Sequence, residues 1–177
     1  MTALLFLLLA VVLAFTGGGG TWMPIAVVIA SAVAGTTLPD LDAALGLRHR
    51  SAVLHSIVPL AVAMLDRRTW PVAAGLGLGL GLHLAADLFP NGMRGFATIK
   101  LPLWGSIGAG ASYLWIAANA AGNLASGAWL LGRIATRQTA GAALAAVGAL
   151  GVVYLLRTDG GWWALMMFAG LGWLALR

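Results

Sequence analysis

The chain has 177 residues, of which 61% are hydrophobic and only 8% are charged, and its net charge is +5. Soluble domains carry about 25% charged residues, so the composition excludes a water-solvated surface and indicates an integral membrane protein with a single domain, residues 1–177. The absence of cysteine excludes disulfides and thiolate metal ligands, and positive charges scattered through short loops argue against nucleic acid as a partner.

Apolar runs along the chain predict an all-α fold, a polytopic bundle of transmembrane helices, because backbone groups in lipid must be hydrogen-bonded within their own segment. We expect about six or seven membrane segments, several of them shorter than the roughly 20 residues of a full span. The first run, Met1–Phe15, lacks the basic start of a signal peptide, which favours a retained helix over a cleaved leader. The run 103–131 is interpreted as one helix or as a loop followed by a helix. The predicted segments are 3–16, 22–38, 52–65, 70–90, 103–131, 139–156 and 161–176.

Glycine and leucine alternate in the middle of the predicted segment 70–90. Inside so long an apolar run we interpret them as helical, which places Gly75, Gly79, His83 and Asp87 in one row at i, i+4 spacing. Glycines in such a row form a groove in which another membrane helix can lie close. The row therefore predicts a partner helix that reaches His83 and Asp87, and a purely structural groove fits the pattern equally.

A stripe of polar residues is predicted on the helix within 103–131, at Ser112, Asn119, Asn123 and Ser126. Polar side chains at helical spacing face protein rather than lipid. Hydrogen bonding between helices is the favoured interpretation, and a supporting role beside a functional site is the alternative.

All three histidines and three of the five aspartates fall in two short segments within residues 36–104. We expect the loop 39–51 at one membrane face, His55 in the first turns of the segment 52–65, and the end of the segment 70–90 back at that face. An extended loop would point Asp40 and Asp42 to the same side. Ionisable groups gathered at membrane depth indicate a functional site. Its candidate members are Asp40, Asp42, His49, Arg50, His55, His83 and Asp87.

Histidine and aspartate together suit a divalent metal ion, with zinc favoured and manganese or iron as alternatives. The candidate ligands are six, which exceeds the three that one catalytic zinc needs and suits two ions, or one ion with a general base. They are Asp40, Asp42, His49, His55, His83 and Asp87.

The candidate catalytic residues are Asp40, Asp42, Arg50 and His55. A bound ion would lower the pKa of water toward 7 and supply a hydroxide nucleophile, with Asp40 or Asp42 as general base. Arg50 would clamp an anionic group such as a phosphate. Ser56 is not favoured as a nucleophile, because its neighbour His55 would face another direction on a helix.

The motif order resembles the YdjM-type family of predicted membrane-bound metal-dependent hydrolases. The resemblance rests on Pro39-Asp40-x-Asp42, His49-Arg50, His55-Ser56 and His83-x-x-x-Asp87, with Pro90, Gly92 and Pro102 following. It implies that the six His and Asp residues are metal-site residues, with Arg50 and Ser56 beside them. Ala43 and Leu82 depart from the pattern, where the family often has His and Ser, and the interval from His49 to His55 is one residue longer than its commonest form.

The expected function is hydrolysis of an ester or phosphoester in a lipid or lipid-linked substrate, with membrane lipids as partners. A non-enzymatic metal binder or transporter and a structural or assembly protein are the alternatives. We expect a multi-pass protein of the cell (inner) membrane. Basic residues divide five to five between the faces, and leaving out Arg50 and Arg94 as site residues tilts the site toward the outer, periplasmic side. The expected cytoplasmic group is Arg67, Arg68, Arg133, Arg137 and Arg177.

Overall fold

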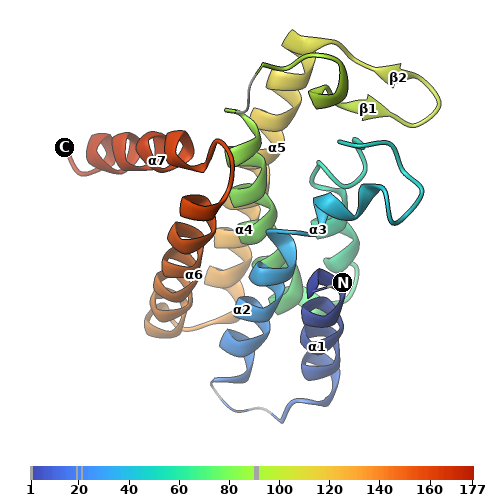
Figure 1. The fold of residues 1–177 in the computed structure, drawn as a ribbon. Helices are drawn as coiled ribbons and strands as arrows, with labels where there is room; N and C mark the ends of the chain where they lie inside the picture. Colours follow the sequence, from blue (N-terminus) through green and yellow to red (C-terminus); the bar gives the residue numbers. More distant parts are fainter. Residues whose placement is uncertain (1, 19, 21, 90–91) are drawn as a thin grey trace.

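The computed structural model describes residues 2–18, 20, 22–89 and 92–177, and in these residues the fold is all-α (Figure 1). Met1, which begins the first apolar run, and Pro90, which ends the fourth predicted segment, lie outside the described residues. The helices are α1 (Thr2–Thr16), α2 (Met23–Gly35), α3 (Val58–Ala63), α4 (Trp70–Asp87), α5 (Ala109–Ile134), α6 (Arg137–Arg157) and α7 (Gly161–Ala175). Short 3-10 helices η1 (Pro39–Asp42), η2 (Arg67–Thr69) and η3 (Gly95–Ala97) and a hairpin of β1 (Lys100–Leu101) and β2 (Gly105–Ser106) complete them.

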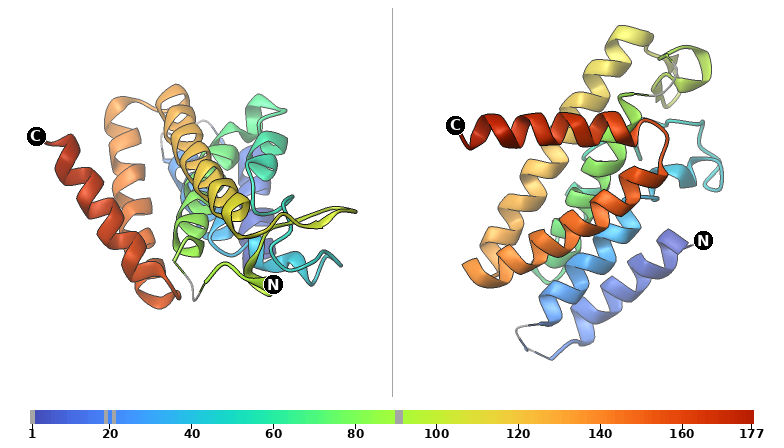
Figure 2. Two further views of the ribbon diagram at one scale, coloured as in Figure 1. Left: turned by 90° about the horizontal axis from the view of Figure 1, so that it is seen from above. Right: turned by 60° about the vertical axis from the view of Figure 1, so that its left-hand side comes forward.

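The glycine-rich helix α4 forms the centre of the bundle, with almost all of its residues buried. It packs most extensively against α5 and α2, while α1 lies on the other side of α2 (Figures 1 and 2). Helices α6 and α7 add further contacts with α4. The C-terminal ends of α2 and α4 and the N-terminal end of α5 lie at the same end of the bundle, which is the upper end in Figure 1.

The alternating glycines of α4 allow two helices to approach its backbone from opposite sides. A Cβ on Gly75 or Gly79 would collide with carbonyl oxygens of α2, and a Cβ on Gly77 would lie 2.7 Å from the carbonyl oxygen of Asn123 in α5. Residues two apart on a helix point about 200° apart. Glycines at every second position therefore leave room for α2 on one side of α4 and for α5 on the other. The helical interpretation of this stretch and the predicted partner helix in the groove are confirmed, and the partner is α2.

Four predicted segments correspond closely to helices, namely 3–16, 22–38, 139–156 and 161–176. The prediction for 52–65 is largely wrong, because only Val58–Ala63 is an α-helix and residues 52–57 form turns and bends. His55 therefore lies in a turn before α3. For 103–131 the second interpretation is confirmed, since a hairpin precedes α5.

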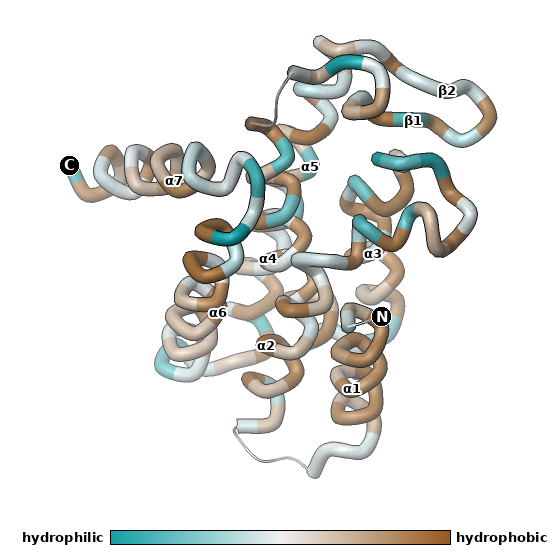
Figure 3. Tube along the Cα trace, viewed as in Figure 1, coloured by the Kyte–Doolittle hydropathy of each residue, from teal (hydrophilic) through white to brown (hydrophobic). Residues whose placement is uncertain are grey.

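Apolar side chains cover much of the outer surface of the bundle. Two helical stretches, Arg67–Asp87 and Arg137–Arg157, are long and apolar enough to cross a membrane, and α1, α2 and α7 are shorter apolar helices. The tube of α1 is hydrophobic along its length, whereas hydrophilic residues gather in the loops at the upper end (Figure 3).

Helix α7 turns sideways at the end of α6 and does not run back along the bundle (Figures 1 and 2). Its C-terminal residue, Arg177, therefore does not return to the end that carries Arg133 and Arg137. The expected place of Arg177 on that face is wrong, and the charge difference between the two faces is smaller than the sequence suggested.

Candidate metal centre

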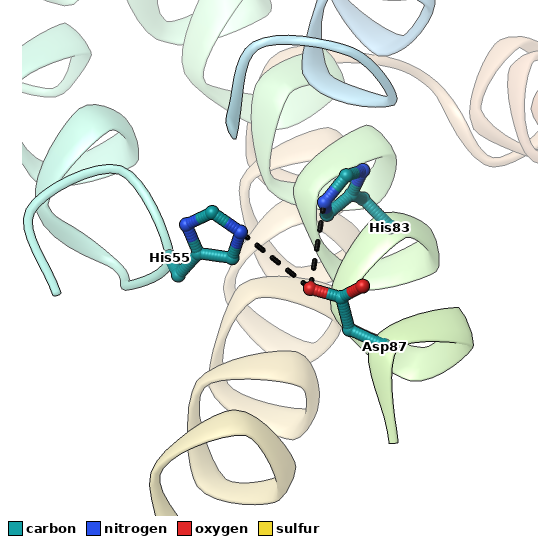
Figure 4. Close-up of side chains that lie close together, drawn as sticks. All are labelled: His55, His83 and Asp87. Atoms are coloured by element: carbon teal, nitrogen blue, oxygen red, sulfur yellow. Dashed lines mark ion pairs between the residues drawn. The ribbon is translucent and has the colours of Figure 1, made fainter. Parts of the chain in front are cut away.

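Three of the predicted ligands converge at the end of the bundle that is uppermost in Figure 1, and Figure 4 shows their side chains together. His83 and Asp87 lie one turn apart at the end of α4, and His55 approaches from the turn before α3. Asp87 Oδ2 lies 3.5 Å from His55 Nε2 and 3.6 Å from His83 Nε2. One ligand atom from each of the three residues lies within 4.8 Å of the other two.

The two distances from Asp87 Oδ2 to the histidine nitrogens are compatible with a shared divalent ion. Ligand atoms about 2.0–2.2 Å from a tetrahedral zinc lie roughly 3.3–3.6 Å apart, and both measured distances to Asp87 Oδ2 fall in this range. Asp87 Oδ2 is buried and has no hydrogen-bond partner among the described residues. A buried carboxylate oxygen without a donor is costly unless a cation or a proton sits beside it.

The ring of His83 is oriented by a backbone carbonyl from the end of α2. Its Nδ1 lies 2.9 Å from the carbonyl oxygen of Thr36 and 3.0 Å from the hydroxyl of Tyr154 in α6. A carbonyl oxygen can only accept, so Nδ1 carries the proton and donates it to Thr36. Nε2 then presents a lone pair to the site, as a metal-ligating histidine does.

His55 is held by a carboxylate on one side and by α5 on the other. Asp42 Oδ2 lies 3.5 Å from His55 Nδ1 and accepts a 3.0 Å hydrogen bond from the backbone N–H of Ser51. Trp115 donates its indole N–H to the carbonyl oxygen of His55 at 2.8 Å. Asp42 therefore lies behind the histidine ring, although no hydrogen bond joins them, because His55 Nδ1 has no hydrogen-bond partner among the described residues.

Burial shifts the pKa of both members of this pair. Burial, followed by the influence of His83, lowers the pKa of His55 to about 2, so its ring is neutral. Burial also raises the pKa of Asp42, although the hydrogen bond from Ser51 opposes this change. A neutral imidazole is the form that binds a metal ion.

Arg50 is buried and its guanidinium is already bonded within the protein. It donates to Asp87 Oδ1 at 2.8 Å and to the carbonyl oxygen of Ala97 at 2.7 Å. Its backbone has a φ of 56°, which non-glycine residues rarely adopt. These contacts engage Asp87 Oδ1 and leave Asp87 Oδ2 without a partner among the described residues, so the guanidinium of Arg50 is not presented as an open phosphate clamp.

Asp40 and Asp42 do not share one environment, because η1 replaces the expected extended loop. The prediction that both side chains point the same way is wrong. The side chain of Asp40 is 63% exposed, and its Oδ1 lies 4.0 Å from His83 Nε2, at the mouth of the site. The side chain of Asp42 is only 2% exposed.

His49 is not brought into the cluster. It is exposed, and its ring stacks on Phe96 with the ring centroids 3.9 Å apart. Burial and the neighbouring Arg50 lower its pKa. Ser56 donates to the carbonyl oxygen of Val53 within the turn, which is a structural contact.

Side chains of α5 hold the irregular segment that carries His55. Asn119 Oδ1 accepts from the backbone N–H of Ile57 at 2.9 Å, and the Asn123 amide donates to the carbonyl oxygen of Ser56 at 3.3 Å. Polar residues of this stripe thus form hydrogen bonds with the backbone of a turn beside the site. Both interpretations of the stripe therefore apply in part: it forms hydrogen bonds between segments, and it supports the segment that carries His55. Tyr154, Thr36 and Trp115 were not predicted as neighbours of the site.

Comparison with known proteins adds no assignment, because no family model, curated protein or solved structure matches the chain. The resemblance to YdjM-type proteins stays a prediction from the motifs.

Proposed function

We propose that the protein is an integral membrane, metal-dependent hydrolase that acts on an ester or phosphoester of a lipid or lipid-linked substrate. The observation that supports it most is the convergence of His55 Nε2, His83 Nε2 and Asp87 Oδ2, of which Asp87 Oδ2 is buried without a hydrogen-bond partner among the described residues. Two histidines and one aspartate form a familiar type of ligand set for catalytic zinc. Manganese and iron are the alternatives.

The membrane part of the proposal is supported by the outer surface. Soluble monomers rarely expose large continuous apolar patches, yet the large side chains of α1, α6 and α7 are extensively exposed. In water this surface would cause aggregation, and in a bilayer it is the surface that lipid requires. Exposed examples are Leu4, Leu5, Leu8, Val152, Val153, Trp163 and Met166.

A divalent ion at the three side chains would supply a Lewis acid and activate water for hydrolysis. The chain contributes the remaining parts. Asp40, exposed beside His83, is placed to accept a proton as general base. Thr36 binds the ring of His83, Arg50 binds Asp87, and Asp42 lies beside the ring of His55. A lipid substrate is favoured because the mouth lies at the end of an apolar bundle.

Elemental analysis of the detergent-purified protein tests the metal site. We expect near-stoichiometric zinc, manganese or iron in the wild type and loss of the metal in His83→Ala/Asp87→Ala. His49→Ala is the matched control, because it removes the histidine that lies outside the cluster. A folded wild type without metal after reconstitution would refute the site, and equal metal loss in His49→Ala would refute the ligand assignment.

Hydrolysis is tested next with lipid phosphoesters and zinc or manganese. The proposal expects turnover by the wild type and by His49→Ala, and none by Asp40→Asn that still binds metal. Metal binding without turnover of any lipid ester would favour a non-enzymatic metal protein. Vesicle metal flux that depends on Asp87 would point to transport, and His83→Ala that unfolds without changing metal content would indicate a structural cluster.

A further inference from the structure

An apolar hairpin tip projects from the same end of the bundle as the metal centre. Strands β1 and β2 pair Lys100 with Ser106 and Leu101 with Gly105, so residues 102–104 form the tip. Leu103 is fully exposed and Trp104 is 86% exposed. Nothing in the described chain covers these two large side chains.

The backbone conformation at the tip shows that leucine does not occupy position 103 for the sake of hairpin stability. Leu103 has a φ of 70°, a left-handed conformation that glycine adopts freely and leucine rarely adopts. The Trp104 N–H donates to the carbonyl oxygen of Leu101 at 3.4 Å, so Leu103 follows Pro102 as the second central residue of a tight turn, where a positive φ favours glycine. The chain instead places a large apolar side chain there, which suggests that the side chain has a partner outside the fold.

Basic residues surround the hairpin, and no acidic residue occurs in residues 43–52 or 92–108. Arg48 and Arg94 are exposed, and neither forms an ion pair with any residue in the described part of the chain. Lys100 lies over the ring of Phe96, which is itself 74% exposed. Exposed aromatic and basic side chains together are typical of surfaces that bind anionic lipids.

The direction in which the hairpin extends agrees with a lipid surface as its partner. It extends sideways from the bundle, and the view along the bundle shows it reaching beyond the neighbouring helices (Figures 1 and 2). If the bundle crosses the bilayer, a sideways hairpin at its end lies along the lipid headgroups.

We propose that the tip 102–104 is an interfacial anchor that inserts Leu103 and Trp104 into the leaflet at the site face, while Arg48 and Arg94 bind phosphates of anionic phospholipids. This inference rests on the membrane location proposed above and is independent of the metal and of hydrolysis. The anchor is joined to the site through the backbone. Lys100 N–H donates to the carbonyl oxygen of Arg50 at 3.0 Å, and Ala52 N–H donates to the carbonyl oxygen of Lys100 at 2.9 Å.

The absence of native cysteine allows a clean test with single-cysteine variants. Pro102→Cys carries an environment-sensitive fluorophore and leaves both anchor side chains in place. The protein is reconstituted in phosphatidylcholine vesicles with phosphatidylglycerol, and lipids spin-labelled near the headgroup or deep in the chains act as quenchers. Val152→Cys, exposed on α6, reports the membrane position of the bundle, and Asp159→Cys reports an exposed turn.

We expect the fluorophore at 102 to be quenched by the shallow label and the one at 159 not to be. In Leu103→Gly/Trp104→Ser the quenching at 102 is lost, and glycine at 103 keeps the backbone conformation, so this variant should fold. Arg48→Ser/Arg94→Ser removes the extra quenching seen with phosphatidylglycerol. Quenching at 152 without quenching at 102 overturns the anchor and leaves the proposed function standing. No quenching at either position overturns both.

Discussion

The contact between α2 and α4 predicts that one methyl group will disturb both the bundle and the metal centre. In Gly79→Ala the added Cβ would collide with the carbonyl oxygen of Ala32 and lie 2.9 Å from the Cα of Gly35. Ordinary contacts begin near 3.4 Å, so α2 must move away by about 0.5 Å or more. Backbone atoms cannot turn aside as a side chain can, and the displaced segment leads directly to Thr36.

The size of the effect follows from a matched comparison. Gly148→Ala in α6 adds a methyl group with nothing within 4 Å of it. Both variants gain about 1 kcal/mol of helix propensity, so their difference isolates the collision, which should cost Gly79→Ala about 1–3 kcal/mol. The same shift would lengthen the 2.9 Å contact between Thr36 and His83 toward the limit of a hydrogen bond. Losing such an orienting contact typically weakens metal affinity about 10–100-fold.

Thermal unfolding in detergent and competition with a metal chelator measure the two effects. We expect Gly79→Ala to unfold at a lower temperature than the wild type and to bind zinc more weakly. Gly148→Ala should match or exceed the wild type in stability and keep its zinc affinity. Equal behaviour of the two variants would refute the close packing of α2 on α4 and its link to His83.

Three further predictions concern the site and its surroundings. Asp42→Asn should weaken zinc binding about 10–100-fold while the three ligands remain, as chelator competition would show; unchanged affinity would contradict an orienting role for Asp42. Because burial lowers the pKa of His55 from 6.5 to about 2, the unfolded chain binds a proton that the folded chain does not. The metal-free protein should therefore lose stability as pH falls below about 6.5, and His55→Gln should flatten that slope in melting curves taken with chelator. If the site faces the outside of the cell, a membrane-impermeant maleimide should label Ala44→Cys in intact cells and Gln138→Cys only after permeabilisation; the reverse pattern would invert the orientation.

The sequence was sufficient for the helices whose apolar runs are continuous. The ends of α1, α2, α6 and α7 follow the predicted segments within a few residues. It failed at 52–57, an apolar run that is not helical. There the backbone is bonded to side chains of α5, including Trp115 and Asn119, about 60 residues away. Hydropathy describes neighbours along the chain and contains no information on such distant partners.

In the site, too, some residues are placed by local helical spacing and others by contacts between distant parts of the chain. The i, i+4 pair His83 and Asp87 could be predicted because helical spacing alone brings the two side chains together. Which of the remaining candidates joins them depends on loop conformations, and here η1 separates Asp40 from Asp42 while stacking on Phe96 holds His49 away. Tyr154 gave no signal because it is a single tyrosine in an apolar helix far along the chain.

The row of glycines on α4 continues directly into the candidate metal centre. Gly75 and Gly79 bring the backbone of α2 against α4, and α2 then ends where the carbonyl oxygen of Thr36 meets the next residue in the row, His83. The carbonyl fixes the proton on Nδ1, so the lone pair on Nε2 faces Asp87, the last residue in the row. Close packing of α2 thus supplies a backbone acceptor for His83, so this candidate ligand is oriented by the end of a packed helix and needs no additional side chain for that purpose.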